Sequence, residues 1–460
     1  MSKIKYIIAT LICITAIFSC KIGQKYEPVE MVDMPDTFDT RGMGEGSTAD
    51  IGWSTLYSDT ILLELISKTL EHNQDVLIAT ARINEMAANN RISFANLFPH
   101  LGGEVAGQKE YLNYGGDSRK YSPELRANLN VSWEVDIWGK LRWANDAAIA
   151  AYMQSVDARQ ALQLTLISQV AQSYFELKAL DRELEIVKQT VEARREGVRF
   201  AKLRYEGGLT SEIPYRQSLV ELARTETLIP RLENELKLKE NDLFVLAGEF
   251  PSGTIKRGEG FDPKKLPLGL PIDLPSSLLK RRPDMLQAEQ KLIQANANVG
   301  IAYTDMFPSL NLIGRLGGEN TELANFLSSP TWFISGVLTG PIFNMGKNKA
   351  KHNAAKAAYE QEVYSYEKAV LGVFKEVNNA IITFQKMREV RQTNEALYTS
   401  ARSYHELAKL QYINGLVSYL DVLDAERQLF DAEIALNKAN LDDLTSLVTL
   451  YKALGGGIIK

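Results

Sequence analysis

Two aspartates three residues apart are the residues whose type and spacing best suit a chemical role in this chain. Asp421 and Asp424 lie in the segment Tyr-Leu-Asp-Val-Leu-Asp-Ala, shortly after a turn signal at Asn414-Gly415. Crowded carboxylates repel one another, raise each other's pKa and can hold a cation. The alternative role is helix capping, because acids in the first turn of a helix interact favourably with its dipole. The residues alone leave both roles open.

Cys20 is the second candidate, because it ends a segment typical of a bacterial export signal. Lys3 and Lys5 give a positive start, and Tyr6–Ile17 is apolar but too short to span a bilayer. A small residue followed by cysteine resembles a lipobox, in which the chain is cut before the cysteine and the thiol carries lipid. We therefore predict a signal peptide over residues 1–19 and lipid attachment at Cys20. The alternative is a plain signal peptide with an incidental cysteine.

No other set of residues suggests catalysis or metal binding. The only cysteines are Cys13 and Cys20, so the sequence offers no disulfide framework, cysteine metal site or thiol nucleophile. The four histidines have no metal-ligand spacing: His72, His100, His352 and His405. The net charge of -5 argues against a nucleic-acid binder. We therefore expect no enzyme, no cofactor and no metal site.

The elements that must position these residues come from a duplicated unit, whose halves match at a spacing of about 207 to 209 residues. Matching landmarks occur in the same order in both halves: Phe98-Pro99 with Phe307-Pro308, Trp138-Gly139-Lys140 with Met345-Gly346-Lys347, and Ala201–Leu209 with Ala408–Leu416. We predict these boundaries: a lipid-anchored extended segment at 20–58, repeat 1 at 59–250, a proline-rich linker at 251–274, repeat 2 at 275–456 and a tail at 457–460.

Each half is expected to contain a leading helix, two strands and a long helical hairpin. The residues from Leu125 to Ile137 alternate strictly between apolar and polar side chains, which is typical of a two-faced strand. Less regular strands are expected at Leu101–Tyr111, Leu310–Leu316 and Thr331–Phe343. The leading helices are expected at Asp75–Leu97 and Asp284–Phe307.

Long helices are expected after each strand pair. Arg142–Tyr205 contains no proline and only one glycine, Gly197, and its apolar residues recur every seven positions, which is a coiled-coil pattern. A tight turn at Gly207–Thr210 should return the chain through a second helix, which Pro230 should kink. The return helices are expected at Ile213–Leu246 and Ser418–Leu454, and the second outgoing helix at Asn348–Ile413.

Four amphipathic strands in an exported chain suggest a membrane sheet shared between copies. Unpaired backbone groups in lipid cost several kcal/mol each, so such a sheet cannot leave its edges open. Closed membrane barrels usually have at least about eight strands, and side chains fill an eight-strand interior. Three copies leave room for a conduit. We therefore predict a mainly α-helical chain with a small membrane β part, forming a trimeric 12-strand β-barrel that a hollow α-helical barrel continues.

Motifs spread over the predicted mature chain resemble the TolC superfamily of outer-membrane factors, specifically its OprM/NodT-like efflux lipoproteins. Besides the lipobox at Cys20, the motifs that carry this resemblance are Tyr26-Glu27-Pro28, Trp53, Phe98-Pro99, Ile137–Lys140, Ile229–Glu233, Arg281–Asp284, Phe307-Pro308 and Tyr419–Ala425. None is decisive alone, but all of them in the family's order are highly specific.

The resemblance implies a homotrimer in the outer membrane, with a twelve-helix α-barrel in the periplasm. It implies a passive exit duct for drugs or other small molecules, docked to a periplasmic adaptor and an inner-membrane pump, usually of the RND type. Asp421 and Asp424 would line the closed periplasmic end, where the first half has Pro214 and Gln217 instead. The hairpin tips would contact the adaptor: Gly208, Leu209, Thr210 and Ser211, with Gly415, Leu416, Val417 and Ser418.

Other readings of the sequence share parts of this pattern. A duct for type I-like protein secretion would have the same architecture. A coiled-coil envelope scaffold without a pore is the alternative of a different class, but the strand alternation and the repeat argue against it. At the tips, the apolar residues Leu209, Leu416 and Val417 suit either a partner surface or packing within each hairpin.

Overall fold

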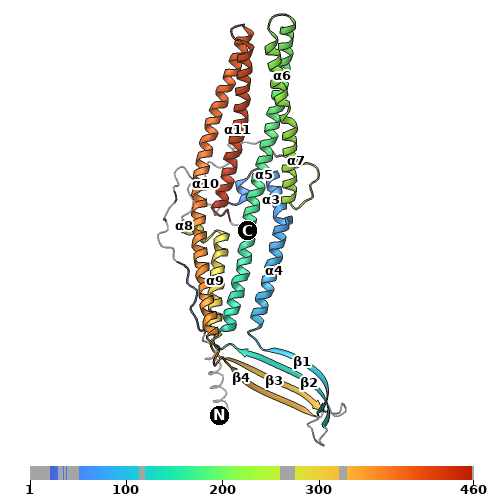
Figure 1. Ribbon diagram of the computed structural model, residues 1–460, viewed down its shortest axis with the longest axis vertical. Coiled ribbons are helices and arrows are strands. Elements are labelled where there is room, and N and C mark those ends of the chain that lie inside the picture. The colour runs from blue at the N-terminus through green and yellow to red at the C-terminus, as the bar shows by residue number, and fades with distance from the viewer. Residues whose placement is uncertain are drawn as a thin grey trace. The chain divides into compact units, whose positions relative to one another are not determined.

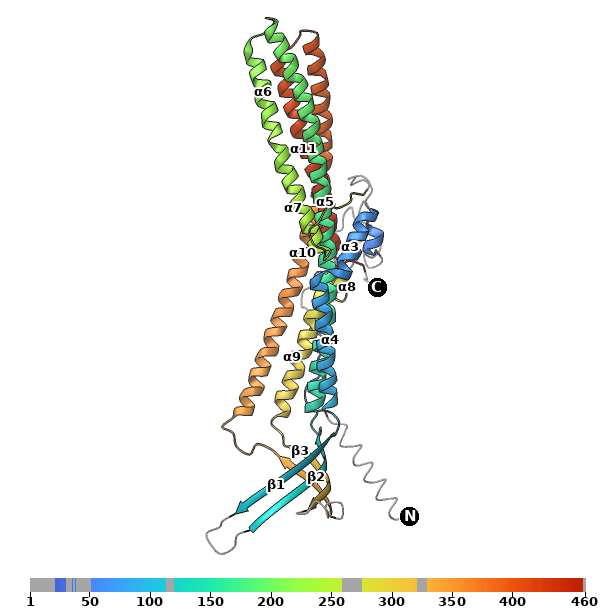
Figure 2. The ribbon, with the colours of Figure 1, turned by 90° about the vertical axis from the view of Figure 1, so that its right-hand side faces the viewer.

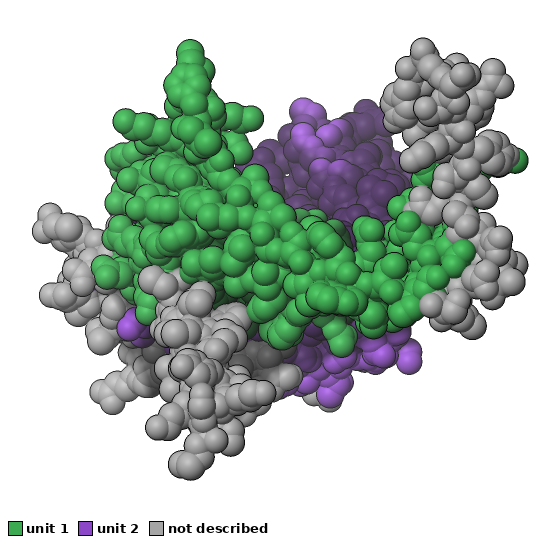
Figure 3. Space-filling model, turned by 90° about the horizontal axis from the view of Figure 1, so that it is seen from below, with its two compact units in different colours: residues 1–32, 81–156, 287–368 green, residues 33–80, 157–286, 369–460 purple. Residues whose placement is uncertain are grey.

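The structure is a computed structural model that describes residues 21–29, 35, 38, 51–112, 120–258, 275–320 and 329–457. The chain divides into two compact units, which Figure 3 colours separately. Unit 1 comprises residues 1–32, 81–156 and 287–368, and unit 2 comprises residues 33–80, 157–286 and 369–460. Each unit takes residues from both halves of the duplicated sequence. The predicted lipid site at Cys20 and most of the predicted linker lie outside the described residues.

Unit 1 contains an antiparallel sheet whose strands follow one another in chain order (Figure 1). The strands are β1 (His100–Leu112), β2 (Lys120–Val135), β3 (Ser309–Asn320) and β4 (Pro330–Thr339). The pair β2–β3 joins the two repeats, with Val135 opposite Leu310 and Trp133 opposite Leu312. This order leaves β1 and β4 as the outer strands of the sheet.

The sheet has one polar and one apolar face, as the alternation along β2 predicted. The register places Asn128 of β2 opposite Glu104 of β1, and Asn130 opposite Arg315 of β3, so polar residues of neighbouring strands share a face. Arg126 Nη2 donates to Gln108 Oε1 (3.2 Å) across this face. The opposite face carries exposed apolar side chains, including Leu129, Leu316, Trp332 and Ile334.

Two strands end earlier than predicted, and each end has a local cause. β2 stops at Val135 because Asp136 turns back to accept hydrogen bonds from the backbone N–H groups of Leu141 and Arg142, which start the next helix. β4 stops at Thr339, so its predicted extension to Phe343 was wrong. Pro341 follows and has no N–H to donate to a ladder.

The first repeat supplies α4 (Gln74–Ala95), the 67-residue helix α5 (Lys140–Glu206), and a return path through α6 (Glu212–Glu226) and α7 (Leu228–Leu246). The predicted kink at Pro230 is confirmed as a break between α6 and α7 at Thr227. Proline lacks an N–H, and its ring clashes with the carbonyl four residues earlier, which here belongs to Glu226, the last residue of α6.

The second repeat supplies α9 (Pro283–Thr304), the 67-residue helix α10 (Lys347–Ile413) and the unbroken 35-residue return helix α11 (Tyr419–Ala453). In unit 2, α5 and α10 each form a hairpin with their return helices, and Figure 2 shows the two hairpins side by side. The heptad seam predicted for α5 is buried at Leu177, Val187, Val191 and Ala201.

Three helices in the part of the chain that the structure describes were not predicted: α2 (Trp53–Leu56), α3 (Thr60–His72) and α8 (Pro275–Leu279). Asp59 caps α3 by accepting from the N–H groups of Ile61 and Leu62, and it also binds Tyr174 and Lys178 of α5, each at 3.0 Å. Among the helices in the described ranges, none is long and apolar enough to cross a membrane.

Residues Lys21–Val29 form a strap along unit 1. Ile22 donates from its N–H to the Trp138 carbonyl (3.1 Å), and Trp143 Nε1 donates to the Ile22 carbonyl (2.8 Å). Lys21 pairs with Asp146, and its Nζ lies 3.4 Å from the centre of the Trp143 ring. Trp143 itself is 3% exposed and belongs to the core of the unit, so the strap is fixed at its first residues.

Candidate functional site

The two hairpin tips are built in the same way. Two residues after α5 and α10 end, the chain has a glycine in the left-handed region, Gly208 (φ 70°) and Gly415 (φ 73°). At each tip the glycine N–H and the next N–H bond back to carbonyls three and five residues earlier, which is a Schellman motif. The leucine that follows each glycine is exposed, Leu209 by 71% and Leu416 by 74%. Each tip therefore presents an apolar side chain to its surroundings.

The two return helices begin differently. Ser418 and Asp421 form a capping box: Ser418 N–H donates to Asp421 Oδ2 (2.8 Å), and Asp421 N–H donates to Ser418 Oγ (3.4 Å). These bonds from Ser418 lower the pKa of Asp421 below its ordinary value. Ser211 occupies the equivalent cap position of α6 but makes no side-chain capping bond. Within one chain, Asp421 is thus an ionised capping residue.

Asp424 lies one turn further along α11 and has its own partners. Arg427 Nη2 donates to Asp424 Oδ1, and Gln428 Nε2 donates to Asp424 Oδ2, both at 2.6 Å. These partners are three and four residues away on the same exposed helix face. The structure therefore places both predicted acids on the surface at the start of α11, and the capping role holds for Asp421. Their role in a seal remains a prediction.

Tyr419, which starts α11, fits against the single glycine of α5. A Cβ atom added at Gly197 would lie 2.7 Å from the Tyr419 hydroxyl oxygen, so a larger residue there would force the Tyr419 side chain to shift. The Tyr419 ring also packs on Tyr412 at 5.4 Å between ring centres, and Arg204 of α5 lies 5.1 Å from the Tyr412 ring. The two hairpins thus meet directly below their tips.

A charged cluster lies between the same helices, centred on Arg194. Arg194 is 5% exposed, donates to the Glu221 carbonyl (2.8 Å) and lies 3.3 Å from the Glu221 carboxylate. Its guanidinium also lies 5.6 Å from the Phe430 ring of α11. Burial raises the pKa of Glu426, although Arg194 opposes that shift, and burial lowers the pKa of His405, which lies 4.0 Å from Glu426.

Sequence reasoning missed this cluster and the Gly197–Tyr419 contact. Gly197 was visible as the only glycine in the long helical stretch, and that was the one available signal. Arg194 and Glu426 look like ordinary surface charges in the sequence, because their burial depends on the contact between the two hairpins. In the described part of the chain, no group of three or more His, Cys, Asp or Glu residues could hold a metal ion.

Comparison with known proteins identifies the family of the chain. The model of the family "Outer membrane efflux protein" matches residues 65–249 and 274–456. The cation efflux system protein CusC of Escherichia coli O157:H7 is 31% identical over 451 residues, which is 96% of each chain. The probable outer membrane lipoprotein SilC of Salmonella typhimurium is 30% identical over 90% of each chain.

A solved structure shows the same fold. The open state of the MtrE outer membrane channel of Neisseria gonorrhoeae superposes with a TM-score of 0.88 at 28% identity, covering 95% of this chain and 98% of that one. The predicted family, the mainly helical fold with a small sheet and the outer-membrane location are confirmed. The chain therefore belongs to the outer membrane efflux protein family.

Proposed function

We propose that this protein is the passive outer-membrane exit duct of a tripartite efflux system, assembled from three copies of the chain. The observation that carries the proposal is the two-faced sheet of unit 1 joined to long paired helices. Its apolar face suits lipid and its polar face suits a water-filled passage. No catalytic step is required of the duct, because the energy for transport comes from the pump.

The outer strands of the sheet support the assembly. Among the described strands, β1 and β4 each have a neighbour on one side only. Unpaired backbone groups at a strand edge are unfavourable in lipid. Pairing β4 of one copy with β1 of the next would give the backbone N–H and C=O groups of both edges hydrogen-bond partners. Three copies would close a sheet of about twelve strands, wide enough to leave an open interior.

Asp421 and Asp424 are the proposed seal. Both side chains are exposed at the start of α11, so copies of the chain can bring them close together around an axis. Asp421 is already ionised in the single chain, because its pKa is lowered. Crowding of ionised carboxylates would make the closed ring easy to open, or would bind a cation that holds it shut.

The tips and the N-terminus are the proposed contacts with other components. Leu209 and Leu416, with their neighbours Gly208–Ser211 and Gly415–Ser418, would bind a periplasmic adaptor that couples the duct to an inner-membrane pump, for which we propose the RND type. Cys20 would carry the lipid anchor, a role supported by the relative SilC, which is named as a probable lipoprotein. Small molecules or ions are the proposed cargo, since the relative CusC is named for cation efflux.

Planar-bilayer conductance tests the duct and the seal together. The wild-type protein should give small conductance steps, and the variants Asp421→Ala and Asp424→Ala should raise them several-fold. Ser418→Ala is the matched control, because it removes the capping bond and keeps both charges. Asp431→Ala removes an exposed acid elsewhere on the same helix.

The outcomes separate the possibilities. Equal increases in Asp421→Ala and Ser418→Ala would show that the cap matters and the charge does not, which would overturn the seal. Absence of conductance in every variant would overturn the duct and favour a scaffold without a pore. Passage of an unfolded polypeptide at the rate of small solutes would instead favour the protein-secretion duct.

A further inference from the structure

The loop that follows β2 is packed onto the second repeat. Trp138 stacks on Phe307 with ring centres 5.0 Å apart, and its Nε1 donates to the Pro308 carbonyl (2.7 Å). Two residues later, Lys140 Nζ lies 2.7 Å from Asp305 Oδ1. This junction joins the end of β2 to the start of β3 within unit 1.

The loop that follows β4 is its counterpart in the second repeat, and it is uncovered. Met345 occupies the position of Trp138 in the repeat, yet it is 85% exposed. Its neighbours Ile342 and Phe343 are 103% and 80% exposed. Met345 also has φ 53°, the only positive φ of a non-glycine residue in the described ranges. Three large apolar side chains within four residues are thus presented to solvent.

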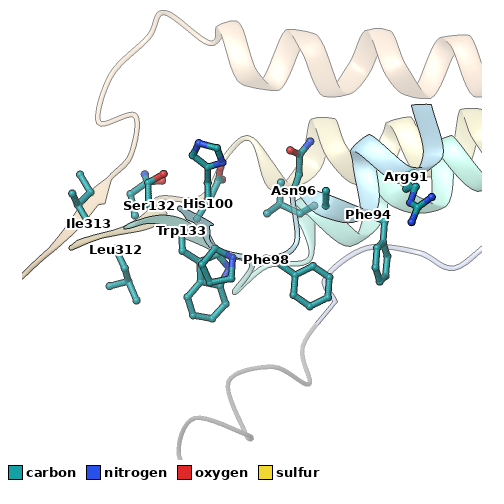
Figure 4. A pocket seen from close by; sticks show the side chains of 14 residues that line it. Arg91, Phe94, Asn96, Phe98, His100, Ser132, Trp133, Leu312 and Ile313 are labelled. Carbon is teal, nitrogen blue, oxygen red and sulfur yellow. The ribbon is translucent and has the colours of Figure 1, made fainter. Parts of the chain in front are cut away.

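The surface that corresponds to Phe307-Pro308 is also uncovered. Phe98-Pro99 occupies the equivalent place before β1 and lines an open pocket of about 910 Å³ (Figure 4). Phe94 and Phe98 are 51% and 55% exposed, and Trp133 lines the same pocket. The side chains of Phe98, Trp133 and Leu312 point to the same side of the sheet in Figure 4. Phe98-Pro99 thus forms a surface like the one on which Trp138 packs at Phe307-Pro308. No side chain of the described residues fills it in the way that Trp138 does.

The two uncovered surfaces lie at opposite edges of one sheet. Phe98-Pro99 leads into β1, the Met345 loop follows β4, and the strand order is β1-β2-β3-β4. Neither Met345 nor its two apolar neighbours line the pocket. A second copy placed with its β1 beside this β4 would bring the loop and the pocket together.

Side-chain sizes at the two junctions are complementary. Within the chain, Trp143 of α5 packs against Gly300 of α9, where an added Cβ would lie 2.4 Å from the Trp143 ring. The counterpart of Trp143 is Ala350, and the counterpart of Gly300 is Arg91. Within the chain, the large residue is Trp143, on the helix after the strand pair, and the small residue is Gly300. At the uncovered surfaces the sizes are reversed: the helix after the strand pair has the small Ala350, and the leading helix has the large Arg91.

We infer that the Met345 loop, with Ile342 and Phe343, docks into the Phe98 pocket of a second copy of this chain, with Ala350 of one copy against Arg91 of the next. This contact between two chains would have the same arrangement as the Trp138–Phe307 junction within one chain. Besides these side-chain differences, the contact lacks the ion pair of that junction, because Asn96 stands where Asp305 does and Lys347 has no carboxylate in the place where Lys140 has one. The inference rests on the self-association proposed above and names its contact residues.

A volume swap tests the contact. Ala350→Trp should collide with Arg91 of the neighbouring copy and reduce the fraction of trimer in detergent at least tenfold, measured by sedimentation. The double variant Ala350→Trp with Arg91→Gly recreates the Trp143–Gly300 pair and should restore the trimer. Arg91→Gly alone controls for the cost of a glycine within α4, and circular dichroism checks that each variant remains helical.

Cross-linking gives a second measurement that does not depend on the volume swap. Met345→Cys combined with Phe98→Cys should yield covalent trimers with a short bis-thiol reagent, whereas each single variant should not. Phe250→Cys, at a residue that is 92% exposed, replaces Phe98→Cys as the control pair. Normal trimers in Ala350→Trp, or equal cross-linking in the control pair, would overturn the inference.

Conductance separates this inference from the proposed function. Cross-linked trimers that fail to conduct would keep the contact and remove the duct. Conducting trimers that neither cross-link at these positions nor respond to Ala350→Trp would keep the duct and remove the contact.

Discussion

The two helical hairpins of unit 2 come from one duplicated sequence, but they return from their tips in different ways. The first returns through two helices of 15 and 19 residues, separated at Thr227, and the second returns through one helix of 35 residues. The cap also differs, since only the second hairpin has a capping box. The first hairpin therefore has a joint, and the second is a continuous rod that starts at the proposed seal.

One position accounts for much of this difference. Pro230 of the first hairpin corresponds to Asn437 of the second. Asn437 is 6% exposed, and its Nδ2 donates to the Ala179 carbonyl of α5 (2.9 Å). A buried asparagine with one partner on the neighbouring helix is a typical means of fixing helix register. At this position the return helix of the first hairpin is broken, whereas the return helix of the second hairpin is hydrogen-bonded to α5 of the first hairpin.

Asn437→Pro should have the largest effect, because it transfers the joint to the second hairpin. A proline in a helix interior costs about 3 kcal/mol, and loss of the buried hydrogen bond adds about 1 kcal/mol. The midpoint of thermal unfolding, followed by circular dichroism in detergent, should fall clearly. Pro230→Asn is the reciprocal control and should leave the midpoint unchanged or raise it. An unchanged midpoint in Asn437→Pro would show that an unbroken α11 does not contribute to stability.

Arg194→Ala should have the next largest effect, since it removes the centre of the charged cluster between the hairpins. Breaking a buried ion pair costs about 3 kcal/mol or more, because the partner is left without its counter-charge, and partial exposure of Glu221 reduces this to about 2 kcal/mol. The unfolding midpoint in denaturant reports the loss. Arg195→Ala, which removes an exposed pair next to it, should change nothing measurable. Equal effects of the two substitutions would contradict the buried role.

Ser418→Ala should destabilise the protein by about 1 kcal/mol, the usual cost of losing an N-cap side chain. Ser211→Ala should cost much less, since Ser211 makes no capping bond. Hydrogen exchange of the first turns of α6 and α11 would resolve the two effects locally. If Ser211→Ala increases exchange in α6 as much as Ser418→Ala does in α11, the caps are equivalent.

Glu426→Gln should have the smallest effect, visible only as a change with pH. Burial raises the pKa of Glu426 in the folded protein, so the folded chain binds more protons than the unfolded chain at intermediate pH. Stability should therefore fall as the pH rises from about 4.3, the ordinary value for glutamate, through the raised pKa. The glutamine variant should lose this slope. The first hairpin has Leu219 at this position and should contribute no such dependence.

The sequence was sufficient for the elements and insufficient for the contacts between them. Alternation along β2, the heptads of α5 and the proline at 230 act within a few residues, so the strand, the helix and its break could be predicted. The short helices α2, α3 and α8 carry no long periodic pattern, and they were missed. Burial of Arg194 and Glu426 depends on helices some 200 residues apart in the sequence, and no local pattern records it.

The predicted site shows the same limit. Asp421 and Asp424 could be picked out by type and position, and the capping alternative came from their place in a first turn. Which hydrogen bonds each acid makes depended on side-chain geometry: Asp421 turns back to Ser418, while Asp424 turns forward to Arg427 and Gln428.

The strap of residues 21–29 has a mechanical consequence. Its first residue, Lys21, is held by Asp146 and the Trp143 ring, and Cys20 comes directly before it. Consecutive Cα atoms are about 3.8 Å apart, so only one peptide bond would separate a lipid-bearing Cys20 from the first fixed residue, Lys21. Such an anchor has almost no slack. It would fix the distance of Trp143 from the membrane surface as well as hold the protein at the membrane.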